Sequence, residues 1–156
     1  MSFLPSKLSE LYGGLDMDAL EKALEQLLPR TLDDIIRTNR DKAQLYFSTD
    51  HELNPLRGTV GFGPVTARVS NWAFITLHIK ESQVDFVYLV GFNQEERCSW
   101  MTSFVTGIDK GKVTTKSGSL YELVGDSTLD VDLPYICATL HLWGLGPKLG
   151  VPHFFF

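Results

Sequence analysis

The segment Val84–Phe92 constrains the fold of this chain strongly, because it is apolar on both faces of a possible strand. Its alternate positions carry Val84, Phe86, Tyr88, Val90 and Phe92. Val87 and Leu89 lie on the opposite face, since successive side chains of a strand alternate between its two sides. An apolar surface on each side of a sheet has to be covered. The chain must therefore supply cover for both faces.

Further strand patterns run from about Thr59 to Leu123 and are separated by turn residues. Gly63-Pro64 interrupts two short apolar stretches, and Trp72–Lys80 alternates regularly between two faces. Asp109–Gly111 and Ser117–Gly118 are typical hairpin turns. Strands joined by such short turns pair in antiparallel fashion. The pattern predicts a meander of about five or six strands.

Helical patterns lie on both sides of this strand region. Asp16 can cap a helix whose apolar face is Met17, Leu20, Leu24, Leu27 and Leu28. Thr31 can cap another helix, which would turn Leu32, Ile35 and Ile36 inward. Near the other end, Asp132 can cap a helix over 133–143, and Gly144 can end it.

We therefore expect an α+β fold in which N-terminal helices and a C-terminal helix cover an antiparallel β-meander. With 156 residues, the chain has the size of a single domain. Within that domain, 1–48 would be mainly helical, 58–124 would form the sheet, 132–144 a helix and 147–156 an extended apolar tail. The N-terminal helices would cover one face of the sheet, and the C-terminal helix would help to cover the other.

Composition narrows the classes of function. A formal net charge of −5 disfavours a protein that coats nucleic acid, because such binding requires clustered lysine and arginine. Two cysteines are too few for a disulfide framework and favour a reducing compartment. The sequence shows no signal-peptide pattern and no apolar run of membrane-spanning length. We expect a cytoplasmic protein without membrane contact.

The sharpest candidate for catalysis is the pair Cys137 and His141. A spacing of four residues places both side chains on one helix face, where a histidine can activate a thiol or begin a metal site. His78 or Cys98 from the sheet could join them. The more ordinary interpretation is a small buried cysteine beside a histidine at the edge of the core. We favour this second interpretation.

Other chemical signatures are weak. The sequence lacks nucleophile-elbow, zinc-protease and Cys-x-x-Cys motifs. Gly58–Gly63 is rich in glycine but lacks the Lys-Ser/Thr of a phosphate loop, so strand bends explain it better. Neither a metal site nor a cofactor is predicted.

Two surfaces remain as candidates for binding. Lys110, Lys112 and Lys116 could hold an anionic partner, although edge strands often carry lysine simply to prevent unwanted pairing. The tail residues Phe154, Phe155 and Phe156 would form an exposed apolar patch unless they pack on this domain, on a second copy or on a partner.

The leading hypothesis is a small cytoplasmic module that binds another protein or itself, for example an inhibitor, immunity or antitoxin-like accessory protein. It rests on an acidic compact domain with an apolar tail and without a catalytic signature. A thiol-dependent enzyme that uses Cys137 and His141 is one alternative. A nucleic-acid-binding accessory protein that uses the hairpin Lys110–Lys116 is another, and it is not favoured.

Overall fold

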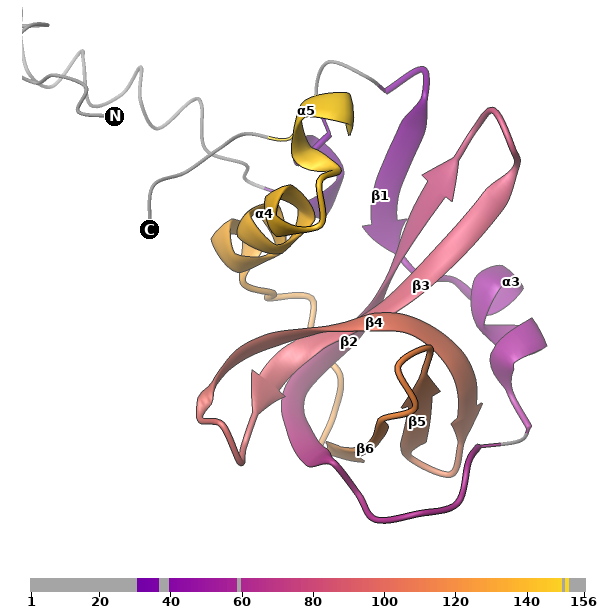
Figure 1. Ribbon diagram of the computed structural model, residues 1–156, viewed down its shortest axis with the longest axis vertical. Coiled ribbons are helices and arrows are strands. Elements are labelled where there is room, and N and C mark those ends of the chain that lie inside the picture. The colour runs from indigo at the N-terminus through magenta and orange to yellow at the C-terminus, as the bar shows by residue number, and fades with distance from the viewer. Residues whose placement is uncertain (1–30, 37–39, 59, 150, 152–156) are drawn as a thin grey trace, which may run out of the picture.

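The computed structural model describes residues 31–36, 40–58, 60–149 and 151. Within them, one sheet contains six strands, β1 (Ala43–Phe47), β2 (Ala67–Ile79), β3 (Val84–Asn93), β4 (Cys98–Asp109), β5 (Lys112–Thr115) and β6 (Leu120–Val124). The α-helices are α3 (Asp50–Leu53), α4 (Leu133–Leu142) and α5 (Gly146–Leu149). Two 3-10 turns, η1 (Leu32–Asp34) and η2 (Asn54–Leu56), complete the described elements (Figure 1).

The sheet closes on itself, because β2 pairs with β6 as well as with β1 and β3. Consecutive strands from β2 to β6 are antiparallel, whereas β2 and β6 are parallel, in register from Ala67↔Tyr121 to Ser70↔Val124. Strands that alternate in direction bring the first and the fifth into the same orientation, so a closed ring of five needs one parallel pair. The predicted α+β fold with an antiparallel meander is therefore wrong: the structure is a mixed five-stranded barrel with β1 added outside it.

A bulge in β2 lets this strand contribute buried side chains to two separate cores. The register with β3 shifts between Ser70 and Ala73, and Asn71 has a φ of 48°. One extra residue reverses the alternation of all later side chains. Val69 consequently faces the inside of the barrel before the bulge, whereas Ile75 faces the opposite side after it.

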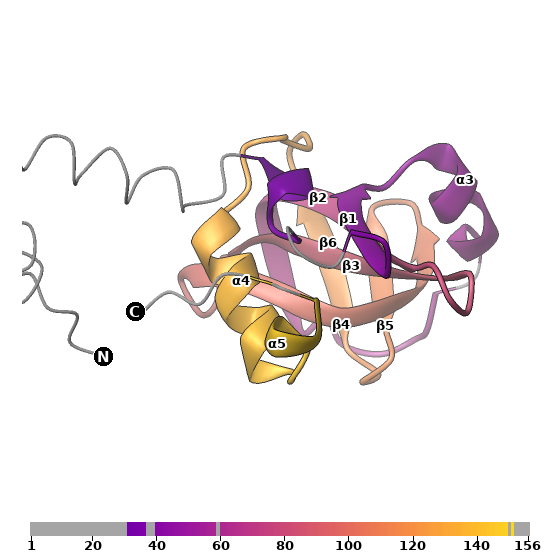
Figure 2. The ribbon, with the colours of Figure 1, turned by 90° about the horizontal axis from the view of Figure 1, so that it is seen from above.

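The two cores lie on opposite faces of the β2–β3 ribbon. We call the first the barrel core; its buried members are Ala67, Val69, Val87, Leu89, Val105, Val113 and Tyr121. We call the second the layer core; its buried members are Leu32, Ile35, Ile36, Ala43, Leu45, Ala73, Ile75, Leu77, Tyr88, Val90, Met101, Ile136, Cys137, Leu140, Leu149 and Val151. Figure 2 shows α4 and α5 together at the end of the molecule opposite α3.

The cover of the sheet differs from the prediction. Leu32, Ile35 and Ile36 are buried as expected, but they belong to a 3-10 turn and its flank rather than to a helix. They pack in the same core as Leu140 of α4, so the described N-terminal segment and the C-terminal helix cover one face. The other face needs no helix layer, because β4, β5 and β6 curl over it. The predicted helix after Asp16 lies outside the described residues.

The start and the end of α4 confirm the prediction from sequence. The Asp132 carboxylate accepts a hydrogen bond from the main-chain N–H of Tyr135, and Pro134 lies in the first turn. Gly144 has a φ of 78°, which suits a residue that follows a helix. The extended segment predicted from 147 onward is wrong for its first residues, since Lys148 and Leu149 belong to α5.

Two further differences lie between β1 and β2. The segment after residue 48, where no helix was predicted, contains α3 and η2. The Glu52 carboxylate accepts hydrogen bonds from the N–H and the hydroxyl of Thr49, each at 2.8 Å, which fixes the first turn of α3. The predicted strands within 59–66 are absent from the described residues 60–66, and β2 begins only at Ala67.

Candidate binding sites

The first half of β4 is an open edge of the sheet. β5 pairs with β4 only from Val105 to Asp109. Among the described residues, no strand pairs with 98–103 on the side away from β3. Such an edge presents main-chain donors and acceptors to whatever lies beside it.

The alternation of the ladder shows which groups point outward along this edge. The main-chain N–H of Leu89 points toward β4, where it donates to the Thr102 hydroxyl at 3.2 Å. Every second residue of β3 therefore turns its N–H and C=O toward β4, and the residues between turn theirs away. Gly91 and its partner Trp100 consequently form a hydrogen-bonded pair, whereas Phe92 and its partner Ser99 form a non-hydrogen-bonded pair. Ser99 thus directs its main-chain groups away from β3.

A groove of about 400 Å³ follows this edge. We call it the edge groove. It is lined by Tyr88, Trp100, Met101, Thr102, Ser103, Phe104, Ser117, Tyr121 and Trp143. The rings of Tyr88 and Trp143 are 5.2 Å apart, and burial raises the pKa of Tyr88 to about 12. Aromatic walls beside outward main-chain groups suit an extended apolar peptide.

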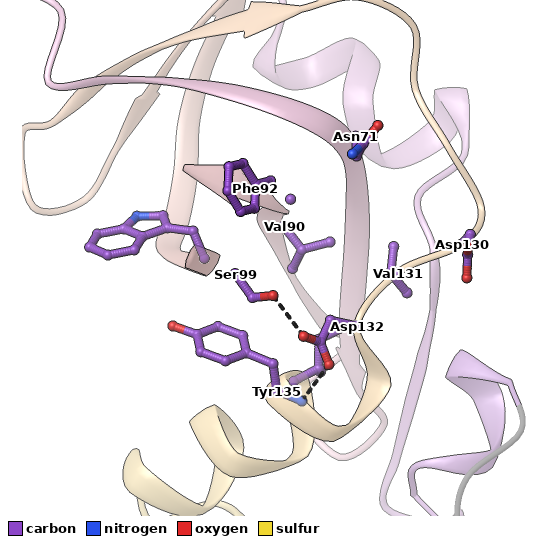
Figure 3. A pocket seen from close by; sticks show the side chains of 11 residues that line it. Asn71, Val90, Phe92, Ser99, Asp130, Val131, Asp132 and Tyr135 are labelled. Atoms are coloured by element: carbon purple, nitrogen blue, oxygen red, sulfur yellow. Dashed lines mark hydrogen bonds between the residues drawn. The ribbon is translucent and has the colours of Figure 1, made fainter. Parts of the chain in front are cut away.

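A smaller pocket of about 180 Å³ adjoins the beginning of the same edge. Figure 3 shows Ser99 pointing toward Asp132, and its hydroxyl donates to that carboxylate at 2.6 Å. Burial is the main cause that raises the pKa of Tyr135, and the nearby carboxylate of Asp132 adds to the rise. Because Asp132 also caps α4, the hydrogen bond from the Ser99 hydroxyl to Asp132 fixes the start of α4 against β4.

The floor of this pocket requires a glycine. A Cβ atom on Gly91 would lie 2.6 Å from Cγ1 of Val69 and 2.8 Å from the carbonyl oxygen of Ser70. These atoms belong to the residues just before the bulge of β2. Gly91 therefore allows the bulged strand to approach β3 closely, and Asn71 and Phe92 line the resulting pocket.

A third cavity, the mouth groove, lies at the end of the barrel where β6 ends. Its volume is about 570 Å³. The lining residues are Phe47, Ser48, Leu53, Arg57, Trp72, Ala73, Phe74, Ile108, Gly111, Leu123, Gly125, Ser127, Thr128 and Leu129. Arg57 carries the charge in this set. The groove combines an apolar wall with one cation.

The structure does not bring the candidate catalytic residues into an open site. Cys137 is completely buried in the layer core. The Nε2 atom of half-buried His141 donates to the carbonyl oxygen of Val151 at 2.8 Å. His78 alternates with Leu77 along β2, so it faces away from the layer core, and its Nδ1 lies 2.6 Å from Asp85. Cys98 is exposed at the start of β4. This arrangement does not favour a thiol mechanism.

The predicted basic surface contains acidic neighbours. Lys110, Lys112 and Lys116 are all exposed. Lys112 is the cross-strand partner of Glu122 on one side and of Asp109 on the other. Lys116 lies one residue beyond the end of β5, and its main-chain N–H donates to the carbonyl oxygen of Phe104 in β4 at 2.9 Å. The local charge is mixed, which weakens the case for a phosphate-binding face.

Phe154, Phe155 and Phe156 lie outside the described residues. Val151, which precedes them, is buried in the layer core.

The sequence reasoning missed both the edge groove and the mouth groove. The open edge beside Tyr88 and Trp100 depends on where β5 stops pairing with β4. The signal available for the mouth groove was Arg57, a lone cation between apolar segments.

No protein-family model, curated protein or solved structure matches this chain. Among the described residues, no helix has the length and apolarity needed to cross a membrane. No group of three or more histidine, cysteine, aspartate or glutamate residues that could hold a metal ion is found in the part of the chain that the structure describes.

Proposed function

We propose that this protein is a binding module that receives an extended segment of a partner protein along the open edge of β4. The observation that carries the proposal is the half-strand 98–103, which pairs with β3 on one side only and whose residues 100–103 line the edge groove. Main-chain hydrogen bonds would supply affinity, and the aromatic walls would select side chains.

An extended peptide fits this site better than a helix does. Outward N–H and C=O groups recur at every second residue of an edge, and only another extended backbone matches that spacing. The side chains of an added strand would alternate between two walls, formed by Tyr88 and Trp143 on one side and by Tyr121 and Ser117 on the other. We expect apolar side chains at alternate positions of the segment.

Substitution of Ser99 provides a sharp test of main-chain recognition. Proline at this position lacks the outward N–H, while the main-chain ladder to β3 does not use that group. Ser99→Pro also removes the hydroxyl that bonds Asp132, so Ser99→Ala is the matched control. Peptides selected from a displayed library of random segments against the unsubstituted protein serve as probes.

We expect the selected peptides to share apolar residues with a period of two. They should bind Ser99→Ala nearly as well as the unsubstituted protein and Ser99→Pro at least about tenfold more weakly, because one main-chain hydrogen bond and its geometry are lost. Circular dichroism checks that both variants fold. Equal binding to the two folded variants, or a helical consensus among the peptides, would contradict strand addition at this edge.

The aromatic tail can be separated from this site by deletion of residues 152–156. Val151 should be retained because its side chain is buried in the layer core. We expect the selected peptides to bind the shortened protein with unchanged affinity. A marked increase in affinity would show that the tail itself competes for the edge, and the proposal of a partner segment would then have to be abandoned.

A further inference from the structure

The mouth groove has the size and the lining of a small-molecule site and is distinct from the β4 edge. Its volume of about 570 Å³ falls within the usual range of roughly 300–1,000 Å³ for such sites. The side chains of Leu53, Ile108 and Leu123 pack against the barrel core, so the floor of the groove is part of a fixed scaffold.

One wall of the groove is aromatic and is held in place by hydrogen bonds. Trp72 and Phe74 meet edge to face, with ring centroids 5.6 Å apart. The indole Nε1 of Trp72 donates to the carbonyl oxygen of Gly125 at 3.0 Å, and the main-chain N–H of Thr128 donates to the carbonyl oxygen of Trp72 at 2.9 Å. The segment after β6 is thereby attached to the bulged strand, and the wall is preformed.

Arg57, which follows η2, carries the charge of the groove. Its main chain is fixed, because its N–H donates to the carbonyl oxygen of Asn54 and the next N–H donates to that of Ile108. The guanidinium group is about half exposed and lies 3.3 Å from Asp50, whose side chain is 82% exposed. An ion pair this exposed is weak, so an incoming anion can replace Asp50 at little cost.

We propose that the mouth groove binds a small amphipathic carboxylate, with its apolar chain along Trp72 and Phe74 and its carboxylate on Arg57. A guanidinium group holds a carboxylate through two parallel hydrogen bonds, which a hydroxyl group cannot reproduce. Burial of the chain supplies affinity, and Arg57 selects the anionic head group. Because Arg57 is the one charged residue in an otherwise uncharged lining, the groove disfavours a cationic ligand.

The test compares decanoate with 1-decanol at pH 7, using tryptophan fluorescence and calorimetry. Trp72→Phe identifies the fluorescence response of the groove, because Trp100 and Trp143 line other cavities. Arg57→Gln removes the positive charge but keeps a long polar side chain, and Asp50→Asn removes the competing carboxylate. Arg68→Gln is the matched control, since Arg68 is also an exposed arginine in an ion pair, with Glu95.

Decanoate should bind the unsubstituted protein at least about tenfold more tightly than 1-decanol does, through a charge-assisted hydrogen bond. Arg57→Gln should abolish this preference, Asp50→Asn should increase the affinity for decanoate, and Arg68→Gln should change neither. Equal binding of both compounds, no binding of decanoate, or a preference that survives Arg57→Gln would overturn the proposal. These outcomes do not depend on strand addition at β4, because Ser99 takes no part in this groove.

Discussion

The barrel core is enclosed by strands that follow one another in the chain, whereas the layer core also needs segments from both ends of the described chain. Residues from Ala67 to Tyr121 build the barrel core. The layer core extends from Leu32 to Val151 and depends on the packing of η1, α4 and α5 against the β2–β3 ribbon. β2 and β6 pair where the barrel closes, so no strand edge is open there. By contrast, η1, α4 and α5 can separate from the sheet on which they pack. We expect the layer core to open locally while the barrel stays closed.

Removing one large side chain from each core tests this difference most strongly. Leu89 and Leu140 are both fully buried, Leu89 in the barrel core and Leu140 in the layer core. Each leucine-to-alanine change should lower the free energy of unfolding by about 2–5 kcal/mol, because a cavity remains. Amide hydrogen exchange then separates the two variants.

Leu140→Ala should accelerate exchange in α4 and β1 and leave the strands of the barrel protected. Leu89→Ala should accelerate exchange throughout both regions, because the layer rests on β2 and β3 of the barrel. If both variants show the same pattern of protection, the two cores unfold as one unit and the distinction fails.

A smaller effect is expected where the two cores share the bulge of β2. Gly91→Ala would place a Cβ atom 2.6 Å from Val69 of the barrel core, and the neighbouring carbonyl of Ser70 cannot move away freely. We expect a loss of about 1–3 kcal/mol, measured by urea unfolding. Gly61→Ala is the matched control, because its Cβ would make an ordinary contact of 3.5 Å with Thr114. A loss of similar size in both variants would show that the close approach at the bulge is not the cause.

Tyr88 makes the layer core sensitive to alkaline pH. Burial raises its pKa from 10.0 to about 12. The unfolded state therefore releases the phenolic proton before the folded state does, so the stabilising contribution is complete below pH 10 and is lost as the pH rises to about 12. Stability measured by urea unfolding should decline over this interval and decline less in Tyr88→Phe. An identical decline in both proteins would assign the effect to other groups.

Local features of this fold could be predicted from the sequence where neighbouring residues determine them. Asp132 and Gly144 mark the two ends of α4 because capping depends on residues within one turn. The hairpin between β4 and β5 follows from Asp109–Gly111 in the same way. The alternation of Trp72–Lys80 also holds, since it begins beyond the bulge.

Closure and the sites could not be predicted, because they depend on residues far apart in the chain. The parallel pairing of Ala67 with Tyr121 leaves no local pattern, and a single extra residue near Asn71 reverses which face is buried. The apolar residues on both faces of β3 correctly indicated that each face must be covered. The sheet itself covers one of these two faces by closing into the barrel. The open edge of β4 follows only from where the pairing with β5 ends at Val105.

The smallest predicted effect concerns the segment that connects the two cores. After β6, the chain passes from the barrel to α4, and Trp72 holds this segment through the hydrogen bond from its indole to the carbonyl oxygen of Gly125. Trp72→Phe keeps an aromatic ring in the wall but removes the donor, so we expect a loss of about 0.5–1.5 kcal/mol. Hydrogen exchange should increase at Thr128, whose N–H donates to the main chain of residue 72, and in the first turn of α4. Barrel amides should remain protected; an increase at Val105 and Val113 instead would mean that the indole stabilises the barrel core rather than its connection to the layer.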